Sequence, residues 1–283
     1  MMSGVRLQHN AAGLELLHVA NERAEAVIAL QGAQILHWAP RGASSVLWCT
    51  SDSHWLPGKA IRGGIPICWP WFAAHGSQPA FPSHGIARTA PWELDHSRLN
   101  SNGATQLLLR MKFSEPMQAW WPYPSDLELH ATVGTQLELT LITRNRGNQP
   151  CSIGVALHSY FAVSDVRQIE IAGLEDSAYI DKTDHGVRKR QTGPCRIDGE
   201  TDRIYQSDSA CRINDPGGQR RIRIEKTGSR STVVWNPWRE KAAGLDDLGA
   251  EGYLHMVCVE SGNVADDVLT LAPGEETQAM GAL

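Results

Sequence analysis

The sequence predicts an all-β protein, and three observations carry that prediction. Polar and apolar residues alternate with a period of two in several segments, as they do in strands with one buried face. Turn signals separate these segments at short intervals, in a chain with 26 glycines and 15 prolines. Helical periodicity is almost absent. Many short strands of this kind favour a sandwich or barrel of antiparallel sheets.

The clearest strands form a hairpin. Residues 126–131 and 136–141 alternate polar and apolar side chains, and the Val-Gly-Thr sequence at 133–135 suits the turn between them. Residues 221–225 alternate again. Apolar runs typical of central strands covered on both faces occur at residues 27–30, 107–109, 232–235 and 256–259.

Helices are expected only as short connectors. The best candidate is 238–248, and Gly244 weakens it because glycine disfavours a helix interior. No linker, internal repeat or low-complexity segment divides the chain. We therefore expect residues 1–283 to form one domain, since all-β domains of about 250 residues are common.

Charge and composition exclude several kinds of partner. The formal net charge of -5 gives no general attraction for nucleic acid or anionic lipid. Residues 1–10 lack the pattern of a signal peptide, and no apolar run approaches the roughly 20 residues that span a bilayer. We expect a cytoplasmic monomer with no nucleic-acid or membrane partner.

The cysteines and histidines suggest no metal or redox centre. The cysteines form no C-x-x-C pair, no histidine pair has the spacing of a metal motif, and phosphate-loop, dinucleotide-binding and serine-hydrolase motifs are absent. We expect no metal and no cofactor, and we expect the cysteines to be small buried hydrophobes. They are Cys49, Cys68, Cys151, Cys195, Cys211 and Cys258.

Residues 61–72 and 83–88 place cationic and planar groups in a backbone rich in glycine and proline. Arg62 precedes two glycines, and Arg88 closely follows Gly85. Either arginine could be a solvated surface residue. Arginine also presents planar bidentate donors that suit phosphate or carboxylate. The surrounding aromatic residues favour the binding of a small, anionic, hydroxyl-rich ligand.

Two ionisable residues end apolar runs. His158 follows residues 153–157, and is either a hydrogen-bonded core histidine or a general acid or base. Glu260 closes residues 254–259. It either marks the point where the chain emerges into water or, if turned inward, acquires a raised pKa that suits a base.

Aromatic residues near these positions have two interpretations. Trp235 and Trp238, with the aromatic residues at 69–72, supply flat apolar faces that most often serve packing. Sugars also stack their C-H faces on such rings. Asp202, by its local sequence, is an ordinary turn residue.

Six segments, taken together, resemble the hexose-6-phosphate mutarotases, also called glucose-6-phosphate 1-epimerases, a branch of the aldose 1-epimerase superfamily. They follow the order of that family from about residue 20 to residue 275. The segments are Ile-Arg-Gly-Gly-Ile-Pro at 61–66, His-Gly-Ile-Ala-Arg at 84–88, His-Ser-Tyr-Phe at 158–161, Glu-Thr-Asp-Arg-Ile-Tyr at 200–205, Trp-Asn-Pro-Trp at 235–238 and Val-Cys-Val-Glu at 257–260.

The resemblance implies a galactose-mutarotase-like β-supersandwich of two large antiparallel sheets. It implies that His158 is the catalytic acid and Glu260 the catalytic base, in an interconversion of the anomers of a hexose 6-phosphate, such as glucose 6-phosphate. A mutarotase of unphosphorylated aldoses and a non-catalytic carbohydrate-binding protein remain the alternatives. The substrate-binding positions are then Arg62, Ser83, His84, Arg88, Asp202 and Trp235; the family often has glutamine where this chain has Ser83.

Overall fold

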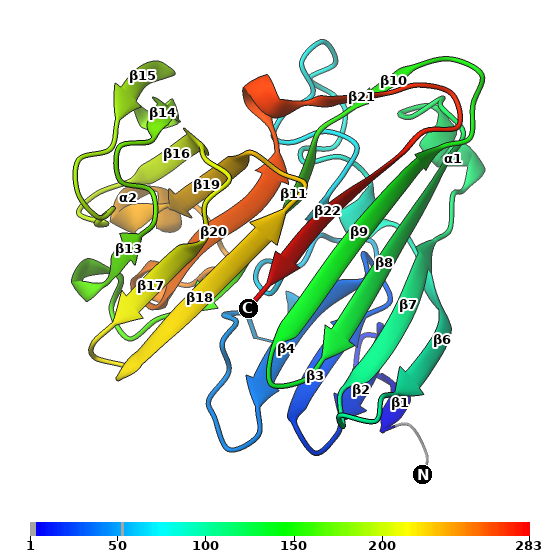
Figure 1. Ribbon diagram of the computed structural model, residues 1–283, viewed down its shortest axis with the longest axis horizontal. Helices are drawn as coiled ribbons and strands as arrows, with labels where there is room; N and C mark the ends of the chain where they lie inside the picture. Colours follow the sequence, from blue (N-terminus) through cyan, green and yellow to red (C-terminus); the bar gives the residue numbers. More distant parts are fainter. Residues whose placement is uncertain (1–3, 52–53) are drawn as a thin grey trace.

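The computed structural model describes residues 4–51 and 54–283, and within them the chain forms antiparallel sheets joined by loops and short helices (Figure 1). The strands of the first half are β1 (Val5–His9), β2 (Glu15–Ala20), β3 (Ala24–Ala29), β4 (Gln34–Pro40), β5 (Ile67–Cys68), β6 (Trp92–Leu99), β7 (Thr105–Met111), β8 (Ser125–Val133) and β9 (Leu137–Asn145). The strands of the second half are β10 (Cys151–Ile153), β11 (Val155–Leu157), β12 (Tyr160–Ala162), β13 (Glu170–Ala172), β14 (Ala178–Asp181), β15 (Val187–Arg190), β16 (Thr201–Gln206), β17 (Cys211–Asp215), β18 (Arg220–Thr227), β19 (Ser231–Asn236), β20 (Met256–Asn263), β21 (Leu269–Leu271) and β22 (Glu276–Ala282).

The helices are short. The α-helices are α1 (Glu115–Gln118) and α2 (Trp238–Ala242), and the single 3-10 turns are η2 (Ala87–Thr89), η3 (Val166–Gln168), η4 (Lys182–Asp184), η5 (Gly252–His255) and η6 (Ala265–Asp267). In the described part of the chain, none of these helices has the length and apolar character needed to span a bilayer.

Two eight-stranded sheets dominate the molecule. One has the strand order β13-β17-β18-β22-β9-β8-β7-β6 and lies at the front of Figure 1. The other has the order β15-β14-β16-β19-β20-β11-β5, with β12 also paired to β20. A four-stranded sheet, β1 to β4, lies behind β7 to β9, and an antiparallel bridge between Ile35 and Ile65 joins it to the loop before β5.

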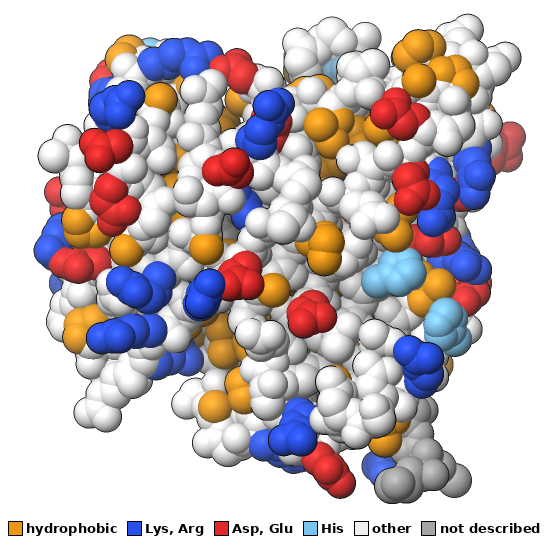
Figure 2. Space-filling model, in the orientation of Figure 1, with side chains coloured by type: hydrophobic (Ala, Val, Ile, Leu, Met, Phe, Trp, Pro, Cys, Tyr) orange, Lys and Arg blue, Asp and Glu red, His pale blue; other side chains and the backbone are white. Residues whose placement is uncertain are grey.

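The outer face of the front sheet is solvated, as an antiparallel sheet with one buried face allows. In β18, Ile222 and Ile224 are buried whereas Arg221 and Arg223 are exposed. Figure 2 shows this face with charged side chains of both signs and hydrophobic side chains only in small, separate groups.

The pleat of the second sheet separates the core from a second face. Val257 and Val259 of β20 and Val234 of β19 belong to the main hydrophobic core. Successive side chains of a strand point to opposite faces. Cys258 and Glu260 therefore point away from that core, to the face on which the candidate site is built.

The structure confirms the expected strands and the prediction of short connecting helices. The hairpin is formed by β8 and β9, with Leu129 opposite Leu141. The helix expected at 238–248 is only α2, which ends at Ala242, because the chain turns at Gly244. All six cysteines are free; five are buried, as expected, and Cys49 is half-buried.

Candidate active site

Strands far apart in sequence bring polar side chains together on the outer face of the second sheet. The register pairs Asp202 of β16 with Trp235 of β19, and Trp235 with Cys258 of β20. Paired residues project from the same face of a sheet. Glu260, two residues after Cys258, projects from that face as well.

His158 meets Glu260 from the neighbouring segment between β11 and β12. Its Nε2 atom lies 3.4 Å from Oε1 of Glu260. The histidine ring stacks on Tyr160, with ring centroids 4.8 Å apart, and its backbone N-H donates to the Pro66 carbonyl. Only 7% of His158 and 1% of Glu260 is exposed, so the glutamate is turned inward rather than toward water.

Each member of the pair keeps a buried atom without a hydrogen bond. Within the described residues, His158 Nδ1 and Glu260 Oε2 have no partner. Buried polar groups in folded proteins are nearly always paired, so the exceptions call for an explanation. Atoms that bond to a ligand during turnover would supply it.

Burial favours the uncharged forms of both groups. It lowers the pKa of His158 well below the ordinary value of 6.5, and the nearby His84 and Arg88 lower that pKa further. It raises the pKa of Glu260 well above 4.5, and Asp202 raises that pKa further. Between these two ionisations the pair holds one proton, so it can both donate and accept.

The predicted site residues line one cavity of about 380 Å³. The structure places all eight of them on its wall: Arg62, Ser83, His84, Arg88, His158, Asp202, Trp235 and Glu260. Residues up to 198 positions apart in the sequence thus line one cavity, as the motifs led us to expect, and the role of each belongs to the proposal below.

Two glycines let the loops that carry the arginines pack closely on the sheets. Gly64 has φ +61° and Gly85 has φ +75°, in the region that disfavours other residues. A Cβ at Gly64 would collide with the Ile35 carbonyl oxygen, and one at Gly85 with that of Trp69. These contacts fix the loops that position Arg62 and Arg88.

The arginines are held by different partners. Arg62 donates from Nε to Oδ1 of Asp247 at 2.7 Å. Arg88 donates from Nη2 to the Ser83 carbonyl at 2.7 Å. Asp247 keeps Arg62 in place and partly neutralises the positive charge of that arginine. Among the ion pairs of the described residues, none joins Arg88 to a carboxylate.

Two lysines on the cavity wall were not predicted. Lys182, in η4, has its Nζ atom 3.4 Å from Oδ2 of Asp202. Lys241, on α2, has its Nζ atom 2.8 Å from Oε1 of Glu200. Neither lies in a motif with a functional signal, and only the tertiary fold brings them to the cavity.

His84 remains uncharged beside the pair. Burial, with Arg88 adding to it, lowers the pKa of His84 to about 3. Its ring centroid lies 5.4 Å from that of His158, and its Nδ1 atom lies 3.4 Å from Sγ of Cys68. A neutral imidazole here can hydrogen-bond to a hydroxyl without adding charge.

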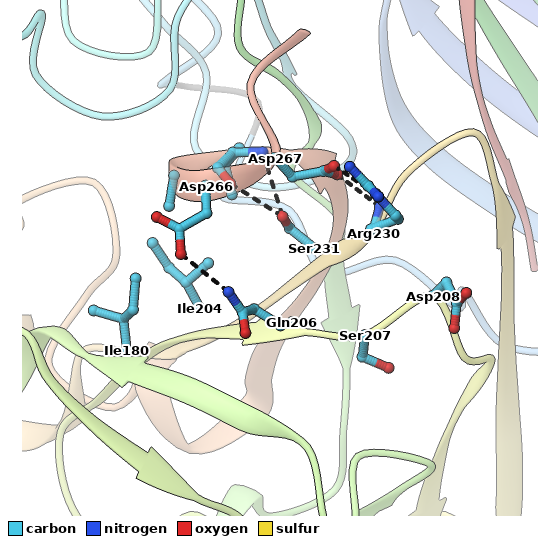
Figure 3. Close-up of a pocket in the computed structure, with 11 residues that line it drawn as sticks. Ile180, Ile204, Gln206, Ser207, Asp208, Arg230, Ser231, Asp266 and Asp267 are labelled. Carbon is cyan, nitrogen blue, oxygen red and sulfur yellow. Dashed lines mark hydrogen bonds and ion pairs between the residues drawn. The ribbon is translucent and has the colours of Figure 1, made fainter.

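A second cavity, of about 390 Å³, lies between β16, β19 and η6 (Figure 3). Its acidic groups already have partners. Asp266 accepts from Gln206 at 3.0 Å and from Arg188, and Asp267 accepts from Arg230. Polar groups that satisfy one another leave little for a ligand, so the cavity around His158 and Glu260 is the candidate active site.

Comparison with known proteins agrees with this geometry. The family model described as Aldose 1-epimerase matches residues 15–283. The chain belongs to the aldose 1-epimerase family. Members of this family act on sugars, and the reaction class is mutarotation.

Relatives of this family member carry more specific names. A Salmonella typhimurium protein named "Putative glucose-6-phosphate 1-epimerase" is 34% identical over 267 residues, covering 94% of this chain and 86% of its own length. A Cenchrus ciliaris protein of the same name is 34% identical over 268 residues, covering 91% of this chain and 80% of its own.

Solved structures confirm the expected galactose-mutarotase-like fold of this aldose 1-epimerase family member. The crystal structure of a "putative mutarotase" from Salmonella typhimurium superimposes with a TM-score of 0.92 at 30% identity, covering 100% of this chain and 93% of the other. A galactose mutarotase-like protein from Clostridium acetobutylicum shares the fold alone, with a TM-score of 0.74 at 12% identity, covering 98% of this chain and 96% of the other.

Removing the carboxyl group of Glu260 should stabilise the protein increasingly as the pH rises. The unfolded chain releases this proton near pH 4.5 whereas the folded protein retains it, because burial raises the pKa. The stability contributed by protonated Glu260 is complete below that value and is lost as the pH rises toward the folded pKa. Each pH unit within this window costs the wild type about 1.4 kcal/mol.

Urea unfolding of Glu260→Gln and the wild type across pH 4.5 to 8 measures this effect. We expect the stability of the variant relative to the wild type to increase with pH. Glu276→Gln is the matched control, because Arg144 lowers the pKa of that exposed carboxyl group. A relative stability of Glu260→Gln that does not change with pH would contradict the burial argument.

Proposed function

We propose that this protein interconverts the α and β anomers of a hexose 6-phosphate, with glucose 6-phosphate as the favoured substrate. The observation that carries the proposal is the buried His158–Glu260 pair, 3.4 Å apart, on the wall of a cavity that also presents cationic side chains. The names of the relatives support the same substrate.

The reaction requires one group that accepts a proton and one that donates a proton. In our proposal the pair's single proton moves from Glu260 to His158 across their contact, which gives a carboxylate and an imidazolium. Glu260 then removes the proton from the C1 hydroxyl while His158 protonates the ring oxygen. The C1–ring oxygen bond breaks and an open aldehyde forms.

Reclosure reverses both proton transfers. Rotation about the C1–C2 bond presents the other face of the carbonyl, and the hydroxyl of C5 attacks it. The proton returns from that hydroxyl to His158, and Glu260 returns its proton to O1. The enzyme ends with the proton count with which it began, and each positioned group contributes typically about 10²- to 10⁴-fold.

The cations on the cavity wall fit a phosphate group. Arg62 and Arg88 are the phosphate ligands in our proposal, because arginine bonds to phosphate in a bidentate manner. Lys182 adds a third positive charge near them, while Asp202 accepts from a sugar hydroxyl. Ser83, His84 and Trp235 complete the proposed contacts with the sugar.

We expect His158→Ala and Glu260→Gln each to lower the rate of anomer exchange by about 10²-fold or more. NMR exchange spectroscopy on glucose 6-phosphate measures the rate directly. His255→Ala is a matched control, since His255 is exposed and lies outside the cavity. Near-normal rates in both active-site variants, with folding verified by circular dichroism, would contradict the mechanism.

The same assay distinguishes the possible substrates. Arg88→Ala and Lys182→Ala should each raise KM for glucose 6-phosphate about tenfold more than KM for glucose, since a charge-assisted hydrogen bond is worth about 1.5–3 kcal/mol. Lys112→Ala, which removes an exposed lysine paired with Glu93, is the control. An equal effect on both sugars would indicate a structural role and favour a mutarotase of unphosphorylated aldoses.

A further inference from the structure

A thiol lies beside the proposed catalytic pair and takes no part in the acid–base steps. Cys258 belongs to β20, two residues before Glu260 on the same face of the sheet. Cys258, His158 and Glu260 each offer one possible ligand atom, and these three atoms lie within 4.8 Å of one another. All three residues are buried.

This combination of side chains matches the donors of a zinc site. Zinc binds thiolate, imidazole and carboxylate groups, and sites open to a fourth ligand use three protein donors. Bonds of about 2.0–2.3 Å in a tetrahedron place the donors about 3.5 Å apart. Small side-chain rotations would bring the three donors from 4.8 Å or less to that spacing.

The unpartnered atoms of the pair supply a second, independent observation. Nδ1 of His158 and Oε2 of Glu260 are buried and make no hydrogen bond in the described structure. Each is a nitrogen or oxygen of the kind that zinc binds. A metal ion bound by Oε2 would give that carboxylate oxygen a partner that the described residues do not provide.

The charges also balance, although Arg62 and Arg88 oppose a cation in this cavity. Binding of Zn²⁺ displaces the thiol proton of Cys258 and the single proton of the His158–Glu260 pair. In the resulting site a thiolate, a carboxylate and a neutral imidazole surround Zn²⁺. Two protons are released. The net charge of the site is therefore unchanged, and the arginines meet no additional positive charge.

We propose that Zn²⁺, a thiophilic divalent cation, binds to His158, Cys258 and Glu260 and inhibits the protein by occupying both members of the acid–base pair. The binding part of this proposal stands on the spacing of the three side chains and on their unpartnered atoms, and does not depend on the proposed function. The inhibition part rests on the proposed function, because it requires that His158 and Glu260 carry the reaction.

A cobalt titration tests binding without reference to activity. Co²⁺ replaces Zn²⁺ in such sites, and a thiolate ligand gives a near-ultraviolet charge-transfer band. We expect this band in the full-length wild type and in the Cys49→Ser and Cys68→Ala controls, which remove the half-buried thiol and the thiol beside His84. We expect its loss in Cys258→Ala, or in the isosteric Cys258→Ser if the alanine variant fails to fold.

Inhibition of anomer exchange by Zn²⁺ forms the second arm. Cys258→Ala should retain its basal rate and require about tenfold or more Zn²⁺ for half-inhibition, since even outer-shell substitutions weaken metal binding to that extent. Three results would overturn the proposal. They are a band that persists in Cys258→Ala, the absence of a band in the wild type under excess Co²⁺, and equal sensitivity of the wild type and Cys258→Ala to Zn²⁺. If the wild type lacks exchange activity but shows the band, the proposed function fails and the metal site stands.

Discussion

Burial of two ionisable groups in contact is the constraint on which the rest of the site depends. Water would stabilise His158 and Glu260 separately in their charged forms, but the sheet face excludes it. The pair is left with one proton between two groups of different basicity. Groups whose pKa values are shifted by burial and by neighbouring charges are typical of catalytic sites. Such groups make the folded protein less stable but more reactive.

The pleat of β20 explains how one strand serves both the core and the site. Val257 and Val259 pack into the main core, while on the other face Glu260 lines the cavity and Cys258 packs against Tyr160. The core thus holds the strand rigidly, and the strand holds the carboxylate at a fixed distance from His158. This rigid support is what positioned acid–base chemistry requires.

Local patterns predicted the strands and singled out His158 and Glu260, whose proposed roles came from the family resemblance. Contacts between residues far apart in the sequence could not be predicted from those patterns. His158 and Glu260 stood out because each ends an apolar run. Asp247 could not be linked to Arg62 from the sequence, since 185 residues separate them. Lys182 and Lys241 look like ordinary surface lysines until the fold places them on the cavity wall. Cys258 was correctly predicted to be buried, but its neighbours depend on the pairing of β12 with β20.

The pH dependence of kcat for anomer exchange of glucose 6-phosphate tests the central claim most directly, because it counts the protons on the pair. A pair that works with one proton gives a bell-shaped profile. The acid limb should lie well below 6.5 and the alkaline limb well above 4.5, as burial of His158 and Glu260 requires. A rate that follows one ionisation near 6.5, the ordinary value for imidazole, or that does not change with pH, would contradict the account.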